Sequence, residues 1–293
     1  MVRARTSRLA SLAALVLAAS LPACADQPDD DGPPDVTTGT YHAFIQHGWN
    51  FPATSQEWRA LGFDFDHNGQ LNNEAGALIG ALGRIGLPIA DANLEQLTRG
   101  DTIVAHVVRA DGLERDDAVA WQLWTSSGAP PRYDGADVVD ADRVDGALAG
   151  QIVAGTLRAE WGEAVIRVPL FPGQGPVALA TTDARVELAV GAACHGRIGG
   201  LLDEADLATA LEQIAQQTLA HMAAHPTHEF TQLARDVFDT DNDAVVSAAE
   251  VVAFAHMILR PDVDTDGDGA RDAVSVAFGF DCAPAVVGVG PAF

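Results

Sequence analysis

The sequence predicts an α+β protein in which an antiparallel β sandwich or open barrel carries packed helical segments. Short runs rich in Val, Ile and Thr, some of them alternating in polarity, fill residues 101–200. Apolar residues at helical spacing dominate residues 39–100 and 201–262. The chain has 293 residues, of which 48% are hydrophobic, and this is enough for a sizeable core.

Residues 1–23 have the features of an export signal. Three arginines are followed by the apolar run 9–19, which is shorter than the roughly 20 residues that a membrane helix needs. The next residues, Leu21-Pro22-Ala23-Cys24, resemble the lipobox of bacterial lipoproteins. The resemblance implies cleavage before Cys24, acylation of Cys24 and attachment to a lipid bilayer. The alternative is an ordinary signal peptide that is cleaved near Ala23 or Ala25.

Residues 24–38 are predicted to be an acidic, flexible tether, because a segment of Asp, Pro and Gly cannot bury an apolar face. Ala25 follows the cysteine where an inner-membrane retention signal would have Asp, so we expect the outer membrane of a bacterial envelope. The formal net charge of −24 repels nucleic acid and attracts cations. Nucleic acid is therefore not expected as a partner.

Two cysteines, Cys194 and Cys282, remain once Cys24 is assigned to the anchor. In an oxidising compartment an even pair predicts a disulfide. The alternative is a pair of buried free thiols.

Residues 39–100 are predicted to be mainly helical. Asp91 is placed to cap a second short helix of this segment. The first helix should present the apolar residues Leu78, Ile79, Leu82 and Ile85 on one face.

Residues 101–200 are predicted to form the antiparallel β region. Two of the expected strands flank Trp161-Gly162 and indicate a hairpin. The expected strands are 102–108, 118–124, 151–160, 163–171, 177–182 and 184–190.

Residues 201–262 return to a helical pattern. Asp203 is the expected N-cap of a helix over 201–224, and further helices are expected at 228–238 and 250–259. The final segment, 263–293, begins with an acidic loop. Its strand-like run 273–281 is expected to join the β region.

The clearest candidate metal site is the twelve-residue segment Asp239–Glu250. Calcium prefers six to eight oxygen ligands at about 2.4 Å, and such a loop can supply them from positions 1, 3, 5, 7, 9 and 12. With helical patterns on both sides, the segment resembles an EF-hand. Position 6 usually holds Gly because φ is positive there, and here it is Ala244. The alternative is a solvated acidic loop. The implied ligands are Asp239, Asp241, Asp243, the Val245 carbonyl, Ser247 and Glu250.

A second candidate is Asp264–Asp272, which resembles the Asp-rich loops of EF-hand-like and thrombospondin type 3 calcium repeats. Position 12 is Ser275, so the usual bidentate Glu is missing. Five carboxylates between Asp262 and Asp272 repel one another unless a cation lies among them. The implied ligands are Asp264, Asp266, Asp268, the Ala270 carbonyl and Asp272.

A third candidate, Asp64–Glu74, repeats the same frame with fewer charges, so we expect it to bind more weakly. The alternative is an Asx-rich turn that caps the following helix. The implied ligands are Asp64, Asp66, Asn68, the Gln70 carbonyl and Asn72. Together the three loops resemble the calcium-loop modules of bacterial surface proteins and imply Ca²⁺ as the cofactor.

Other side chains give weaker signals. His221, His225 and His228 have a spacing that could hold zinc, but solvated histidines near a helix end are the favoured interpretation. Aromatic residues of the β region could stack on sugar rings, although core positions are favoured. These aromatic residues are Trp121, Trp124, Tyr133 and Trp161.

The function predicted from these features is that of a calcium-binding, membrane-anchored envelope lipoprotein. Calcium would stabilise a β domain that binds a glycan or a surface protein. Nucleophile-elbow, phosphate-loop and dinucleotide motifs are absent from the sequence, and catalysis is the less favoured interpretation. The alternative is a calcium-stabilised envelope hydrolase.

Overall fold

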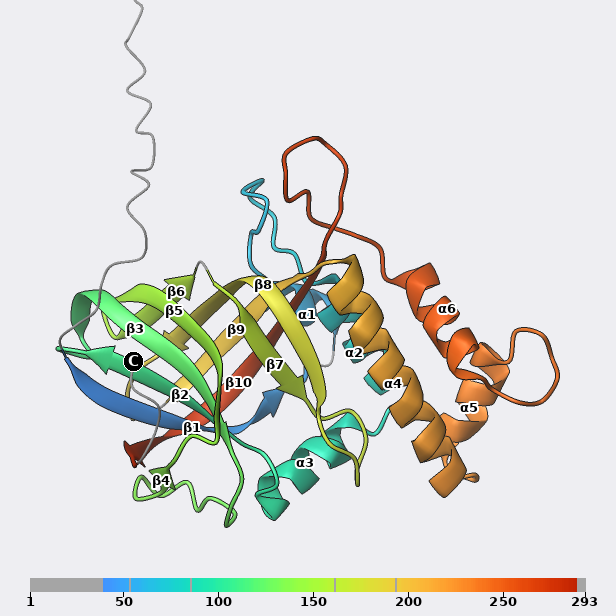
Figure 1. The fold of residues 1–293 in the computed structure, drawn as a ribbon, viewed down its shortest axis with the longest axis horizontal. Helices are drawn as coiled ribbons and strands as arrows, with labels where there is room; N and C mark the ends of the chain where they lie inside the picture. The colour runs from blue at the N-terminus through green and yellow to red at the C-terminus, as the bar shows by residue number, and fades with distance from the viewer. Residues whose placement is uncertain (1–38, 53, 85, 161, 193, 289–293) are drawn as a thin grey trace, which may run out of the picture. The chain divides into compact units, whose positions relative to one another are not determined.

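Eight antiparallel strands close into a barrel in the computed structural model of the protein (Figure 1). The ring closes because the first and last strands pair with each other. Around the ring the strands are β1 (Thr40–Asn50), β2 (Ile103–Ala110), β3 (Arg115–Ser126), β5 (Arg143–Val153), β6 (Thr156–Glu160), β8 (Val177–Ala189), β9 (Cys194–Leu202) and β10 (Val274–Val287). Two short strands join this sheet: β7 (Ala164–Val168) pairs with β5 and β8, and β4 (Val138–Val139) runs parallel to the end of β10.

The structure describes residues 39–52, 54–84, 86–160, 162–192 and 194–288. The signal peptide and tether expected at residues 1–38, Cys24 included, lie outside these residues, as do Ile85 and Trp161.

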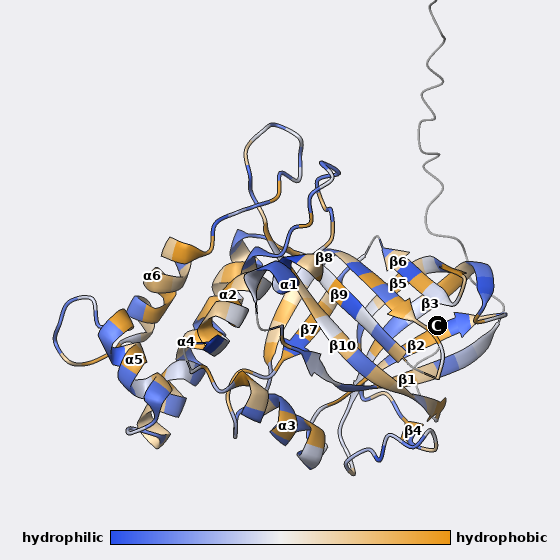
Figure 2. Ribbon diagram, turned by 180° about the vertical axis from the view of Figure 1, so that it is seen from behind, coloured by the Kyte–Doolittle hydropathy of each residue, from blue (hydrophilic) through white to orange (hydrophobic). Residues whose placement is uncertain are grey.

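Side chains fill the interior of the barrel, as expected for a ring of eight strands. Strand alternation places Trp121 and Ile152 in the main core, whereas Val107 and Trp124 belong to a separate cluster on the outer face. That outer cluster also contains Val139 of β4, so β4 covers part of the barrel wall. Figure 2 shows the corresponding alternation of polar and apolar residues along the strands.

The α+β class and the antiparallel barrel are confirmed, but two expectations about the barrel were wrong. It is closed, where an open barrel or a sandwich was expected. Residues 40–50 are strand β1 and not part of a helical segment. β1 pairs with both β2 and β10, so it is the strand that closes the ring.

The strand pairings also correct the expected hairpin at Trp161-Gly162. The chain turns instead at Ala154-Gly155, both of which have positive φ, and this turn joins β5 to β6. β7 then pairs with β8 and not with β6. The runs 177–182 and 184–190 form one strand, β8, with a bulge at Asp183.

Six helices accompany the barrel among the described residues, and α2, α4, α5 and α6 gather at one end of it (Figure 1). Asp203 caps α4 as predicted, because its carboxylate accepts the backbone N–H of Asp206. Asp91 does not cap α3, which begins two residues earlier after Pro88. The helices are α1 (Ser55–Ala60), α2 (Glu74–Arg84), α3 (Ile89–Arg99), α4 (Glu204–Ala224), α5 (Glu229–Phe238) and α6 (Ala248–Ile258).

No single described helix is long and apolar enough to cross a membrane, whereas α2 and α3, which meet at 99°, pass the same test only as a bent pair.

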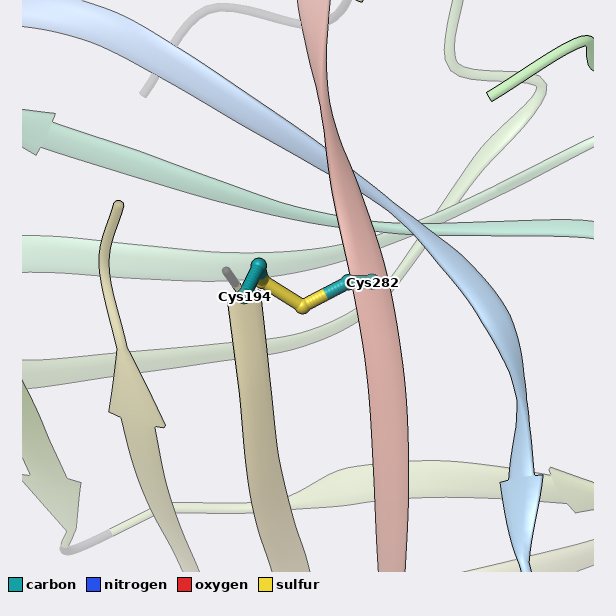
Figure 3. The surroundings of a disulfide bond; sticks show 2 residues. All are labelled: Cys194 and Cys282. Atoms are coloured by element: carbon teal, nitrogen blue, oxygen red, sulfur yellow. A yellow bond between two sulfur atoms is a disulfide. The ribbon is translucent and has the colours of Figure 1, made fainter. Parts of the chain in front are cut away.

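The predicted disulfide between Cys194 and Cys282 is present (Figure 3). The two residues lie directly opposite each other on β9 and β10, with their Cα atoms 4.8 Å apart. The bond therefore joins the last strand of the chain to a neighbour with which it already pairs.

Candidate metal sites

The three acidic segments are loops at the ends of helices. Loop 64–72 connects α1 to α2, loop 239–250 connects α5 to α6, and loop 264–272 connects α6 to β10. All three follow the same path, although they share few residues beyond their aspartates. The backbone has positive φ at positions 4 and 6 of each: His67 and Gly69 (53° and 82°), Asn242 and Ala244 (60° and 68°), and Gly267 and Gly269 (76° and 90°).

Hydrogen bonds from the backbone hold this path in each loop. The carboxylate at position 1 accepts the N–H of position 6, and the side chain at position 5 accepts the N–H of position 7. The first bond joins Gly69 to Asp64, Ala244 to Asp239 and Gly269 to Asp264 at 2.8–2.9 Å. The second joins Gln70 to Asn68, Val245 to Asp243 and Ala270 to Asp268 at 2.7–2.8 Å.

The common path brings side-chain oxygens together. Carboxylate oxygens of Asp239, Asp241 and Asp243 lie within 4.8 Å of one another, and those of Asp264, Asp266 and Asp268 do the same. A left-handed conformation costs a residue with a Cβ atom about 1 kcal/mol. The left-handed backbone at Ala244 therefore has a conformational cost that the glycines at Gly69 and Gly269 avoid.

Loop 64–72 has only two carboxylates in the equivalent positions. It also has two buried acceptor oxygens, Asp66 Oδ1 and Asn72 Oδ1, for which the described residues provide no donor. Such oxygens are costly to bury unless a hydrogen bond or a cation satisfies them. The second oxygen of Asp66 accepts a bond of 2.7 Å from Asn68 Nδ2.

Glu250, the expected position-12 ligand, forms a capping box at the start of α6. One carboxylate oxygen accepts bonds from the N–H and hydroxyl of Ser247, and the other accepts bonds from the N–H and hydroxyl of Thr240. The backbone bonds from Ser247 and Thr240 are the main reason that the pKa of Glu250 is lowered to about 2. Its carboxylate is not part of the aspartate triplet.

Asp272 plays the same role in loop 264–272. Its carboxylate accepts the hydroxyl and the N–H of Thr265 at 2.8 and 3.0 Å, and these bonds lower the pKa of Asp272. Thr240 and Thr265 both occupy position 2. The spacing of acidic residues did not indicate a role for these threonines. The repeated Asp-Thr-Asp, which is visible in the sequence, is the signal that could have suggested one.

Loops 64–72 and 264–272 lie side by side on the barrel (Figure 1). Asn72 Nδ2 donates to the carbonyl oxygen of Asp262 at 3.3 Å, and the N–H of Glu74 donates to Ser275 Oγ at 3.0 Å. Ser275, which sequence analysis placed at position 12, also donates to the carboxylate of Asp262 at 2.6 Å. The segments around the two loops are therefore hydrogen-bonded to each other, whereas loop 239–250 lies beyond the helices, away from the barrel (Figure 1).

Two arginines of the barrel wall contact loop 64–72 and the residues just before it. Arg185 donates to the carbonyl of Asp64 at 2.8 Å and lies over the ring of Phe65. Arg197 donates to the carbonyl of Gly62 and lies over the ring of Phe63. These contacts connect the loop to β8 and β9, so order in the loop and order in the barrel are coupled.

The histidines were expected to be solvated, and this is wrong for His221. Its side chain is buried, with 4% exposure, and neither ring nitrogen has a hydrogen-bond partner among the described residues. Burial, together with the charges of His225 and His228, lowers the pKa of His221 to about 4. His225 is exposed, and His228 is partly buried as the N-cap of α5.

The aromatic residues do not form an exposed platform. The four described tryptophans, which include Trp121 and Trp124, are all buried, so the core interpretation of the latter two is confirmed. Tyr133 is partly buried and its ring lies 4.3 Å from that of His47.

Two hollows among the described residues differ in the chemistry of their lining. A cavity of about 80 Å³ between the helices and the barrel end is lined by apolar side chains and Thr218. A more open hollow contains Asp145, but this carboxylate is held by Arg167 at 2.8 and 3.1 Å and by Thr125. Burial alone would raise the pKa of Asp145, and these hydrogen bonds outweigh it and lower the pKa. Comparisons with protein-family models, curated proteins and solved structures find no match for the chain.

Proposed function

We propose that this protein is a calcium-binding lipoprotein of the bacterial cell envelope in which Ca²⁺ stabilises the barrel. The observation that carries the proposal is the shared path of the three loops. The same positive φ angles and the same Asp-to-amide bonds recur where the sequences differ. An Asx-rich turn needs only one such bond, so three copies of the whole pattern favour loops shaped to hold an ion.

Each loop offers the hard oxygen ligands that calcium prefers. The aspartate triplets of loops 239–250 and 264–272 supply three carboxylates each, and Val245 and Ala270 add carbonyl oxygens at position 7. In the EF-hand-like loop 239–250, Glu250 would exchange its bonds to Thr240 for the ion. Asp66 and Asn72 of loop 64–72 supply the two oxygens that lack donors.

Calcium would act here as a permanent structural ion. Extracellular calcium modules work with dissociation constants of about 10⁻⁴ to 10⁻³ M because calcium is abundant outside cells. Loop 64–72 is bonded to Arg185 of β8 and to Asp262, which lies just before loop 264–272, so bound ions would stabilise the fold directly.

The barrel is proposed to bind a glycan or a surface protein, with catalysis as the alternative. Because the described tryptophans are buried, a glycan would need hydrogen bonds rather than stacking on exposed indole rings. The carboxylate of Asp145 is engaged by Arg167, and this disfavours a role for it in a hydrolase.

Calcium titration of the purified protein without residues 1–35 tests the proposal. We expect at least two Ca²⁺ ions per chain by calorimetry. Asp239→Ala and Asp264→Ala should each remove one ion, because each deletes the ligand that also anchors the loop backbone. Asp64→Ala should have the smallest effect.

The matched control is Asp236→Ala, which removes one exposed carboxylate of α5 just before loop 239–250. It should leave the stoichiometry unchanged. The absence of calcium heat in the parent protein, or equal losses in the control and in Asp239→Ala, contradicts the calcium proposal.

The membrane anchor is tested independently. Growth with labelled palmitate should label the protein through Cys24, and Cys24→Ser should abolish the label. A labelled Cys24→Ser variant, or an unlabelled parent protein, would refute lipidation and leave the calcium proposal unaffected.

A further inference from the structure

Three histidines surround the turn between α4 and α5. His221 lies in the last turn of α4, and His225 follows four residues later as the C-cap of the helix, where the two rings are in contact. The chain then reverses at Pro226 and returns His228 as the N-cap of α5.

Hydrogen bonds fix the backbone of this turn. The N–H of His225 donates to the carbonyl of His221 at 2.9 Å, and the N–H of His228 donates to the carbonyl of His225 at 3.1 Å. The hydroxyl of Thr231 in α5 donates to the same His225 carbonyl at 2.8 Å. The three side chains therefore start from a backbone that is already ordered.

The imidazole rings are separated by distances typical of a shared metal ion. The ring centroid of His221 lies 4.7 Å from that of His225 and 5.2 Å from that of His228. With Zn–N bonds of about 2.0–2.1 Å and tetrahedral angles, the centroids of two ligating imidazoles lie about 5 Å apart.

His221 gives an independent indication of a ligand. It is 4% exposed, both of its ring nitrogens lack a partner among the described residues, and Phe171 and Phe230 pack around it. A buried imidazole without any hydrogen bond is costly, and a metal ion that binds one of its nitrogens removes part of this cost.

We propose that His221, His225 and His228 form a site for a borderline divalent transition metal, represented by Zn²⁺. Imidazole nitrogens suit zinc, copper and nickel, whereas calcium requires oxygen ligands. The site is therefore chemically distinct from the three acidic loops.

Metal binding requires small rearrangements. Among the described residues, only the two aspartate triplets bring three ligand atoms within 4.8 Å, so at least one imidazole must rotate to complete the histidine site. The side chain of His225 is the most exposed of the three and therefore has the most room to rotate. His228 Nδ1 accepts the N–H of Phe230 at 3.2 Å. If Nε2 binds the metal, the proton moves to Nδ1 and this capping bond is lost. His221 and His225 should therefore contribute more affinity than His228.

Zinc titration of the purified full-length protein in detergent, with saturating calcium present, tests the site. Calcium fills the acidic loops, so zinc heat reports on the histidines. We expect one Zn²⁺ per chain in calorimetry and by elemental analysis after dialysis. His225→Gln should weaken zinc binding about tenfold or more, because it removes one of three ligands. Its exposed position leaves the fold intact.

His256→Gln is the matched control, since His256 is an exposed histidine of α6. It should keep the zinc affinity of the parent protein. His228→Asn retains a residue that can cap α5 and should weaken binding less than His225→Gln. The proposal is overturned if the parent protein binds no zinc under these conditions, or if His225→Gln binds zinc as tightly as His256→Gln.

Discussion

Removal of calcium is expected to lower the melting temperature by about 10–20 °C. When the calcium concentration is 100 times the dissociation constant of a site, binding at that site stabilises the native state by about 2.7 kcal/mol. Two such sites contribute about 5 kcal/mol. In a domain of this size each kcal/mol shifts the melting temperature by about 2–4 °C. The large effect follows from the position of loop 264–272, which leads directly into β10, the strand that pairs with both β9 and β1.

Calorimetric melting curves in excess calcium, in chelator, and in chelator followed by excess magnesium measure this effect. Magnesium should restore little, because it demands a tighter octahedral shell. The double variant Asp239→Ala, Asp264→Ala should melt at a temperature that no longer depends on calcium. Coinciding curves for the parent protein with and without chelator would mean that the acidic loops are solvated turns.

Loss of the Cys194–Cys282 disulfide is expected to lower the free energy of unfolding by about 4.6 kcal/mol. The two cysteines are 88 residues apart in sequence, and a cross-link over this length restricts the unfolded chain strongly. The figure is an upper value, because measured effects often fall below the chain-entropy model. The two strands also pair along Val274–Asp281, so the fold itself should persist without the bond.

Urea denaturation of the Cys194→Ser, Cys282→Ser double variant gives this free energy. The Cys24→Ser variant is the control for loss of a cysteine that the disulfide does not use, and it should unfold like the parent protein. A digest of the purified protein under non-reducing conditions should contain the Cys194–Cys282 peptide pair. Two free thiols, or an unchanged denaturation midpoint, contradicts this expectation.

The sequence pattern predicted most of the antiparallel strands but not the closure of these strands into a barrel. Alternating or apolar runs identified most strands between residues 101 and 190, because each strand has one buried face. β1 was missed because its pattern is obscured by a bulge. Its register to β10 shifts between Gln46 and Gly48, and Phe44 and Ile45 are buried on opposite sides of the wall. A strand buried on both faces loses the alternation that identifies strands.

The acidic loops illustrate what spacing can and cannot predict. The Asp-x-Asp frame correctly indicated a turn with positive φ at position 6, Ala244 included. The frame did not predict that Glu250 and Asp272 bind Thr240 and Thr265, because these bonds depend on the path of the whole loop. Nor could it predict the contact of Asn72 with Asp262, which lie 190 residues apart in sequence. The burial of His221 likewise depends on Phe171 of the barrel end.

Closure by the first and last strands also determines when the barrel can form. β1 begins at Thr40 and β10 ends at Val287, so the seam of the ring joins the two ends of the folded chain. A chain that is synthesised from its N-terminus exposes one edge of β1 until β10 is also available to pair with it. Contacts at such large sequence separation slow folding, and unpaired strand edges favour association with other chains. The barrel therefore cannot close until β10 is present to pair with β1 and β9. A chain that ends before β10 leaves β1 and β9 as two unpaired edges.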